Sequence, residues 1–157
     1  MNEGRFDRSG QNSELLFIRK RIWNYAIGNT SLKVRLINNT GAPTVYGSIV
    51  AASTVIDMGF VLAPTDAVSP FGVVYEAGIA DGEECFVITN GLAEVLLQDN
   101  HAPTRGDWVR TSSTTAGRAY TEATPAAAPT HFQEIGHCLV SEGSGTDVLC
   151  VVNLHFL

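Results

Sequence analysis

The sequence predicts an all-β protein, a small antiparallel β-barrel or sandwich with an extended N-terminal arm. Fifteen glycines fall mostly between short apolar, β-branched runs, which leaves almost no room for helices. The apolar fraction of 45% and the charged fraction of 17% are typical of a folded protein, and 157 residues suffice for one domain with a buried core. The densest strand-rich stretch, residues 70–119, contains no cluster of reactive side chains. This stretch therefore favours packing and binding over catalysis.

The N-terminal arm is predicted to comprise residues 1–30, and the β-domain residues 31–157. Residues 1–13 are polar and show no hydrophobic period, which predicts a flexible segment. Residues 14–27 are ambiguous, because Ser13 is able to cap a short helix while the aromatic and β-branched residues after it favour an extended chain equally well.

A clear β-pattern begins at residue 32. Residues 32–37 alternate apolar and basic side chains, as in a strand with one buried face. The Asn-Asn-Thr-Gly sequence at 38–41 predicts a turn, because Asn and Gly tolerate positive φ. Residues 45–55 form a second β-run, in which Gly47 and the small residues around Ala51 indicate a bulge or a close approach of backbones.

The middle of the chain continues as strands and turns. Strands are expected at 60–63, 72–76 and 84–89, separated by the loop at 64–70 and the turn at 80–82. Asn90 and Gly91 form a dipeptide typical of two-residue hairpins, so a hairpin is predicted between residues 84–89 and 92–97.

The last third adds three more strands. Residues 107–111 predict a short strand, and the polar residues 112–117 a turn. Residues 121–130 predict an exposed excursion, because two prolines flank three alanines there. Residues 135–140 and 148–156 are expected to close the domain as two strands.

No motif in the sequence predicts catalysis. His131, His137 and His155 are candidates to converge on a metal, but their spacing is looser than in zinc sites, so neither a metal nor a cofactor is expected. Asp107 beside a glycine predicts a turn carboxylate that accepts local backbone N–H groups. The sequence lacks a phosphate-binding loop, a dinucleotide fingerprint, a nucleophile elbow and an HExxH motif. We therefore expect a protein that is not an enzyme.

The three cysteines predict thiols rather than disulfides. Cys85, Cys138 and Cys150 are odd in number and form no CxxC pair, so reduced, buried side chains are expected.

Charge is divided unevenly along the chain. Residues 1–35 hold seven basic and three acidic residues, a net charge of +4, whereas residues 36–157 hold three basic and thirteen acidic residues, a net charge of −10. This division predicts that the front of the chain meets a negatively charged partner, or else that residues 19–21 merely solvate one end of a short segment. Nucleic acid is not expected as a partner, because the acidic body repels phosphates.

Aromatic side chains lie beside the basic run, a composition typical of interface anchors. The predicted partner-binding residues are Phe17, Arg19, Lys20, Arg21, Trp23 and Tyr25. A membrane is not expected as a partner, since no apolar run approaches the roughly 20 residues that span a bilayer. The first residues contain no apolar signal core, so export by that route is not expected.

Several short motifs resemble the capsid decoration (cement) proteins of tailed bacteriophages. They are Thr-Gly-Ala at 40–42, Gly-Ser-Ile-Val at 47–50, Pro-Phe-Gly-Val-Val at 70–74, Asn-Gly-Leu-Ala-Glu-Val-Leu-Leu at 90–97, Arg-Gly-Asp-Trp-Val at 105–109 and Ala-Gly-Arg-Ala at 116–119. The closing sequences at 131–137 and 153–156 resemble phage structural proteins of the same type. The resemblance covers roughly residues 38–157. Its motifs reflect the spacing of turns and strands and include no catalytic or ligand-binding pattern.

This resemblance implies a β-tulip-like domain that forms a homotrimer on the outside of the phage head. The trimer would sit at three-fold positions and stabilise the lattice of its partner, the major capsid protein. The protein would be made in the host bacterial cytoplasm and end on the exterior of the virion. In such proteins an N-terminal segment commonly extends onto the capsid, and the basic, aromatic front of this chain suits that role.

Two other interpretations remain open. One is a tail, spike or fibre component, or a carbohydrate-binding β-module that uses Trp108 and the loop at 123–130. The other is a hydrolase that uses Asp107 with a histidine.

Overall fold

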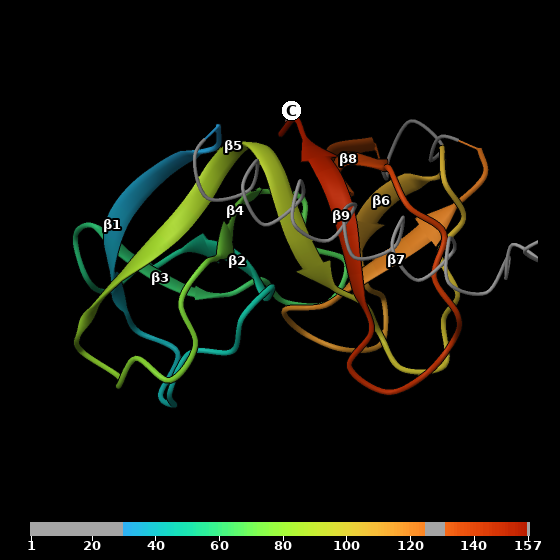
Figure 1. The fold of residues 1–157 in the computed structure, drawn as a ribbon. Coiled ribbons are helices and arrows are strands. Elements are labelled where there is room, and N and C mark those ends of the chain that lie inside the picture. The colour runs from blue at the N-terminus through green and yellow to red at the C-terminus, as the bar shows by residue number, and fades with distance from the viewer. Residues whose placement is uncertain (1–29, 125–130, 157) are drawn as a thin grey trace, which may run out of the picture.

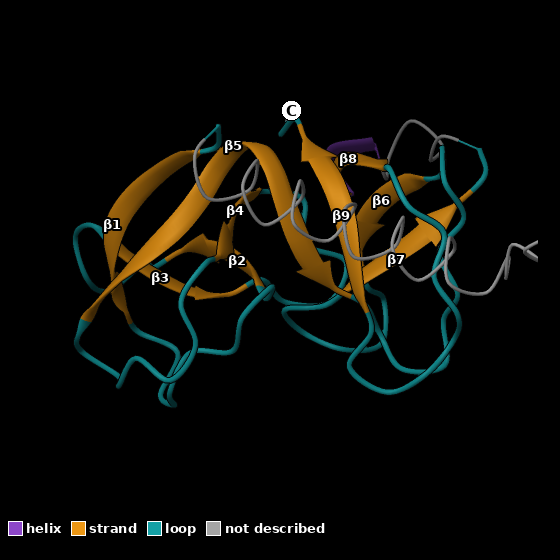
Figure 2. Cartoon of the chain, viewed as in Figure 1, coloured by secondary structure: helices purple, strands orange, loops and turns teal. Residues whose placement is uncertain are grey.

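The computed structural model describes residues 30–124 and 131–156 (Figure 1). This part of the chain holds nine strands and one short 3-10 helix, so the predicted all-β class is confirmed (Figure 2). No helix in it is long and apolar enough to cross a bilayer. In chain order the elements are β1 (Leu32–Asn38), β2 (Ile49–Ala52), β3 (Gly59–Leu62), β4 (Pro70–Val74), β5 (Glu84–Leu96), β6 (Trp108–Thr111), β7 (Ala119–Glu122), η1 (His131–Gln133), β8 (Glu134–Cys138) and β9 (Leu149–Leu154).

Five strands close into a small barrel in the order β1-β3-β2-β4-β5, with β5 pairing back onto β1. Four of the five pairs are antiparallel, and β1 with β3 is parallel. The sequence predicted antiparallel pairing throughout. A closed barrel of five strands is unable to alternate direction all the way round, so one pair has to be parallel.

A second sheet runs in the order β5-β9-β8-β6-β7, and all its strand pairs are antiparallel. A parallel bridge between Leu97 and Ala119 joins its two ends. The two sheets lie side by side and share β5 (Figure 1). We call them the first and the second barrel.

The hairpin predicted at Asn90 and Gly91 is wrong, because β5 continues straight through this dipeptide. Leu32 of β1 pairs with Asn90, and Leu154 of β9 pairs with Gly91, so β5 changes barrels between these two residues. Gly91 has a φ of 92°, and a Cβ there would meet the Cα of Ser31 at 3.1 Å. The same dipeptide chemistry that permits a hairpin permits this bend, and the partners of each half of β5 decide between them.

The wall between the barrels is buried on both faces. Val50, Val74 and Val87 belong to the first hydrophobic core, whereas their chain neighbours Ile49, Val73 and Ile88 belong to the second. Successive side chains of a strand point to opposite faces, so β2, β4 and β5 each serve both cores. This arrangement explains why β2, β4 and residues 85–88 of β5 are continuous apolar runs rather than alternating ones.

The turn predicted at 38–41 and the close approach predicted at Gly47 are confirmed, and one strand is shorter than expected. Asn38 is buried and donates through its side-chain amide to the carbonyls of Ala42, at 2.8 Å, and Ile79, at 3.0 Å, which fixes the turn at 38–41. A Cβ at Gly47 would lie 2.8 Å from Leu149 Cδ2, so the close approach expected there exists. The β-run predicted at 45–55 contains only four strand residues, those of β2.

All three cysteines are free and buried, as predicted. Burial raises the pKa of the Cys85 thiol to about 11, so this thiol stays protonated at neutral pH. The excursion predicted at 121–130 is wrong at its start, because Thr121 and Glu122 belong to β7 and pair with Val109 and Trp108 of β6. Residues 125–130 lie outside the described residues.

We predict that Gly91→Ala destabilises the protein by roughly 1–3 kcal/mol, because a side chain is strained at this φ and collides with the backbone of Ser31. Urea unfolding followed by circular dichroism measures the change. Gly143→Ala is the matched control, since no neighbour lies within 4 Å of the added Cβ and φ there is not positive. The control should change stability by less than about 0.5 kcal/mol. Equal stability of both variants would refute the account of the β5 bend.

Candidate functional site

The predicted partner-binding residues lie outside the described part of the chain. Phe17, Arg19, Lys20, Arg21, Trp23 and Tyr25 all fall within residues 1–29. The described surface offers four further features: a polar network, an aromatic and histidine row, an apolar pocket and an apolar loop.

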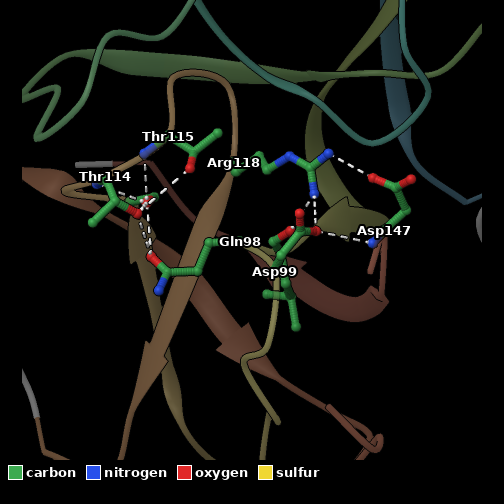
Figure 3. A network of polar contacts seen from close by, with 8 residues as sticks. Gln98, Asp99, Thr114, Thr115, Arg118 and Asp147 are labelled. Carbon is green, nitrogen blue, oxygen red and sulfur yellow. Dashed lines mark hydrogen bonds and ion pairs between the residues drawn. The ribbon is translucent and has the colours of Figure 1, made fainter. Parts of the chain in front are cut away.

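The polar network gathers at one end of the second barrel around Arg118 (Figure 3). Its guanidinium donates to the carbonyl of Leu97 at 3.0 Å, to Asp99 at 2.9 Å and to Asp147 at 2.5 Å. The backbone N–H of Asp147 also donates to Asp99. The Arg118 side chain is 20% exposed, so these bonds are partly shielded from water. Arg118 thereby ties the chain after β5, before β7 and before β9 together.

The hydroxyls beside this network cap the turn at 112–117. Ser112 Oγ donates to the side chain of Gln98 at 2.8 Å and accepts the backbone N–H groups of Thr114 and Thr115 at 3.1 Å (Figure 3). Asp107 Oδ2 accepts the N–H of Thr104 at 3.0 Å, which confirms its predicted turn role. Each of these side chains holds its own loop in shape.

Trp108, His137 and Asn153 form a row across β6, β8 and β9, because each pairs with the next in register. The rings of Trp108 and His137 pack with their centroids 4.1 Å apart, and His155 Nε2 lies 2.8 Å from His137 Nδ1. Two of the three histidines considered for a metal therefore meet. The side chain of the third, His131, is not described. Among the described residues, no group of three or more metal-ligating side chains forms a site.

The imidazole of His101 accepts a hydrogen bond from the backbone of β7. The N–H of Thr121 donates to His101 Nε2 at 3.1 Å, so this nitrogen has to be unprotonated. Burial lowers the pKa of His101 below its ordinary value, which agrees with that role.

An apolar pocket of about 550 Å³ opens where the two barrels meet. Its walls come from segments far apart in sequence, namely Thr44, Val45 and Tyr46 on one side and Leu96, Asp147 and Leu149 on the other. Tyr46 is fixed by a 2.8 Å hydrogen bond from its hydroxyl to Glu94, and burial together with Glu94 raises the pKa of Tyr46 far above its ordinary value. The tyrosine therefore stays neutral and lines the pocket as an uncharged group.

The loop between β2 and β3 carries large apolar side chains into solvent. Val55 is 84% exposed and Met58 is 68% exposed. Sequence reasoning missed this loop because its first apolar residues were assigned to the strand at 45–55. The signal that separates them is Ser53, a residue type that starts turns by bonding the following backbone.

Neither a family model nor a curated protein matches the chain. Among solved structures, the chain is similar to the N base of the head fibre protein gp8.5 of bacteriophage phi29. The TM-score is 0.55 at 14% sequence identity, and the match covers 79% of this chain and 95% of the other. At this identity the likeness establishes a shared fold.

We predict that Arg118→Met destabilises the protein by roughly 1–3 kcal/mol, because two carboxylates and a carbonyl lose a partly buried donor. Methionine keeps much of the aliphatic stem, so the loss reports the charge-assisted bonds. Thermal unfolding monitored by calorimetry measures it. Arg105→Met, at an exposed residue, is the control and should stay within about 0.5 kcal/mol of the parent. Similar losses in the two variants would contradict the role given to Arg118.

We predict that His101 makes stability fall at mildly acidic pH. The unfolded chain binds a proton at His101 near pH 6.5, whereas the folded chain does so only at lower pH. The stabilisation is therefore fully present above about pH 6.5 and is lost as the pH falls through the folded pKa. Urea unfolding at pH 7.5 and pH 5.0 should show a smaller drop for His101→Gln than for the parent. Identical drops would exclude His101 as a source of the pH dependence.

Proposed function

We propose that this protein is a structural component of a phage head, and more specifically a capsid decoration (cement) protein. The observation that carries the proposal is the shared fold with the N base of a phage head fibre protein. The short motifs that resemble decoration proteins point to the same class of particle; they lie at 40–42, 47–50, 70–74, 90–97, 105–109 and 116–119. In this proposal the chain binds the exterior of the head at three-fold positions, as a homotrimer, and stabilises the lattice of the major capsid protein.

The architecture suits a scaffold that is displayed on a surface. In the described residues both sheets return on themselves, through the β1–β5 pairing and the Leu97–Ala119 bridge. Closure leaves few unpaired strand edges, which are the usual template for unwanted association. The side chains at the loop ends mostly satisfy their own turns, as Ser112 and Asp107 do, so we propose a protein that acts by binding and not by catalysis.

The adhesive part of the molecule, in this proposal, is the basic and aromatic segment before β1. Residues 1–31 hold five basic and three acidic residues, a net charge of +2, and Lys33 and Arg35 of β1 raise the charge to +4 over residues 1–35, whereas the rest of the chain has −10. The front of the chain is therefore attracted to an acidic capsid surface while the body is repelled. Three copies joined in one trimer bind with avidity, because the second and third segments attach at high effective concentration.

A second candidate is a tail, spike or carbohydrate-binding β-module. The row of Trp108, His137 and Asn153 favours it, because an aromatic ring beside amide and imidazole groups is able to contact a sugar. Glycan binding that disappears in Trp108→Ala would support this candidate, and labelling at capsid three-fold positions would exclude it.

We predict that removing residues 1–27 lowers binding to expanded, undecorated heads by at least about tenfold, since it removes the aromatic anchors and much of the positive charge. Co-sedimentation of purified protein with heads measures the affinity. The triple variant Arg19→Glu, Lys20→Glu, Arg21→Glu should show a loss in the same direction, and the loss should shrink at high salt. Arg105→Glu, on the body, is the control for a change of net charge. Undiminished decoration by the truncated chain would overturn the proposed role of the segment.

A further inference from the structure

We propose that Cys138 and Cys150 form a redox-sensitive pair, which a small peroxide oxidises to a disulfide bond that cross-links β8 and β9. The two thiols lie in the hydrophobic core of the second barrel, one near each end of the loop between these strands. No step of the reaction involves a capsid, so the inference goes beyond the proposed function and does not rest on it.

The pairing of β8 with β9 places the two cysteines on the same face of the sheet. Cys138 pairs with Val152, and Cys150 lies two residues before Val152 in β9. Because side chains two residues apart in a strand point to the same face, Cys150 is a diagonal neighbour of Cys138. Burial agrees with this placement, since all three side chains belong to the same hydrophobic core. The fold thus brings together two thiols that are well separated in the sequence.

The two sulfur atoms are in hydrogen-bond contact before any oxidation. The Cys150 thiol donates to the sulfur of Cys138, and the Cys138 thiol donates in turn to the Val140 carbonyl at 2.9 Å. The bond from Cys150 lowers the pKa of Cys138 and raises the pKa of Cys150, because it stabilises a negative charge on the Cys138 sulfur. Cys138 is therefore the nucleophile of the pair, since the thiolate is the form that reacts with oxidants.

A small oxidant reaches the pair from the end of β8. Cys138 is the last residue of this strand, the loop at 139–148 follows, and Leu139 beside it is 42% exposed. Strand ends and loops open locally at little cost in free energy. Burial of both thiols then favours hydrogen peroxide over a bulky oxidant such as oxidised glutathione, because a smaller opening admits the peroxide.

The reaction takes place in two steps. The Cys138 thiolate attacks one oxygen of the peroxide, the O–O bond breaks, and the leaving hydroxide takes up the proton released by Cys138 to become water; the sulfur, which has lost two electrons, becomes a sulfenic acid. The Cys150 sulfur then attacks the sulfenic sulfur, the S–S bond forms, and the S–O oxygen leaves with the Cys150 proton as a second water. In a reducing cytoplasm the thiols persist, whereas an oxidising environment favours the disulfide.

Cys85 is an internal control within the same chain. It is buried like the other two cysteines, but it lies in the core of the first barrel, whereas both others belong to the core of the second. Burial raises its pKa to about 11, so it stays a protonated thiol of low reactivity at neutral pH. Peroxide should therefore remove two thiols per chain and spare Cys85.

The test treats the reduced, purified full-length protein with hydrogen peroxide at pH 7.5 and counts thiols after denaturation. The parent should fall from three thiols per chain to one, with a loss of about 2 Da in intact mass, and dithiothreitol should restore both values. Cleavage after Glu134 and Glu142 separates the two cysteines into peptides 135–142 and 143–157. Mass spectrometry should find these peptides joined until they are reduced.

Two variants assign the roles within the pair. Cys85→Ala is the matched control and should fall from two thiols to none. Cys138→Ala lacks the nucleophile and should keep both of its thiols under the same treatment. The melting temperature of the oxidised parent should exceed that of the reduced parent by roughly 5 °C, because the cross-link restricts the unfolded chain, and Cys138→Ala should show no such rise.

Four results would each overturn the proposal. They are the persistence of all three thiols in the parent, the loss of Cys85 at the same rate as the other two, the loss of thiols without joined peptides, and a lower melting temperature after oxidation. The first three are read from the parent alone, so they decide the matter even where a variant fails to fold.

Discussion

The structure depends on one strand that is shared by two barrels. β5 pairs with β1 and β4 over its first half and with β9 over its second half. Its residues therefore face two cores as well as two sets of partners. The continuous apolar runs of β2 and β4 and the bend at Gly91 both follow from this sharing.

Closure with an odd number of strands imposes a second constraint. Each barrel has to contain one parallel contact, and both are short: two residue pairs between β1 and β3, and one bridge between Leu97 and Ala119. Side chains reinforce the second of these seams. Arg118 bonds the Leu97 carbonyl, and His101 accepts a β7 N–H group that no strand covers. The polar network therefore stabilises the junction between Leu97 and Ala119, where the second barrel has the least backbone pairing.

The features that depend on residue type and near neighbours in the chain could be predicted from the sequence. The all-β class, the turn that Asn38 fixes, the close approach at Gly47, the turn role of Asp107 and the buried thiols were all readable from residue type and neighbours. The fate of Asn90 and Gly91 was not readable in this way. The same two residues favour a bend within a strand and a hairpin, and the pairing of β5 with β1 and β9 determines which one forms. The pocket had no sequence signal, since residues 44–46 and 147–149 meet only through the fold. The six predicted partner-binding residues stay a prediction, since they precede the described part of the chain.

The shared strand also determines how the molecule comes apart. Because β5 contributes to both cores, unfolding of one barrel removes strand pairing and apolar contacts from the other. Neither half is then a separable module, and cutting the chain within β5 would leave two fragments that each lack a side of their interior. A protein built this way loses its order all at once, near a single threshold of heat or denaturant, and below that threshold it resists partial opening.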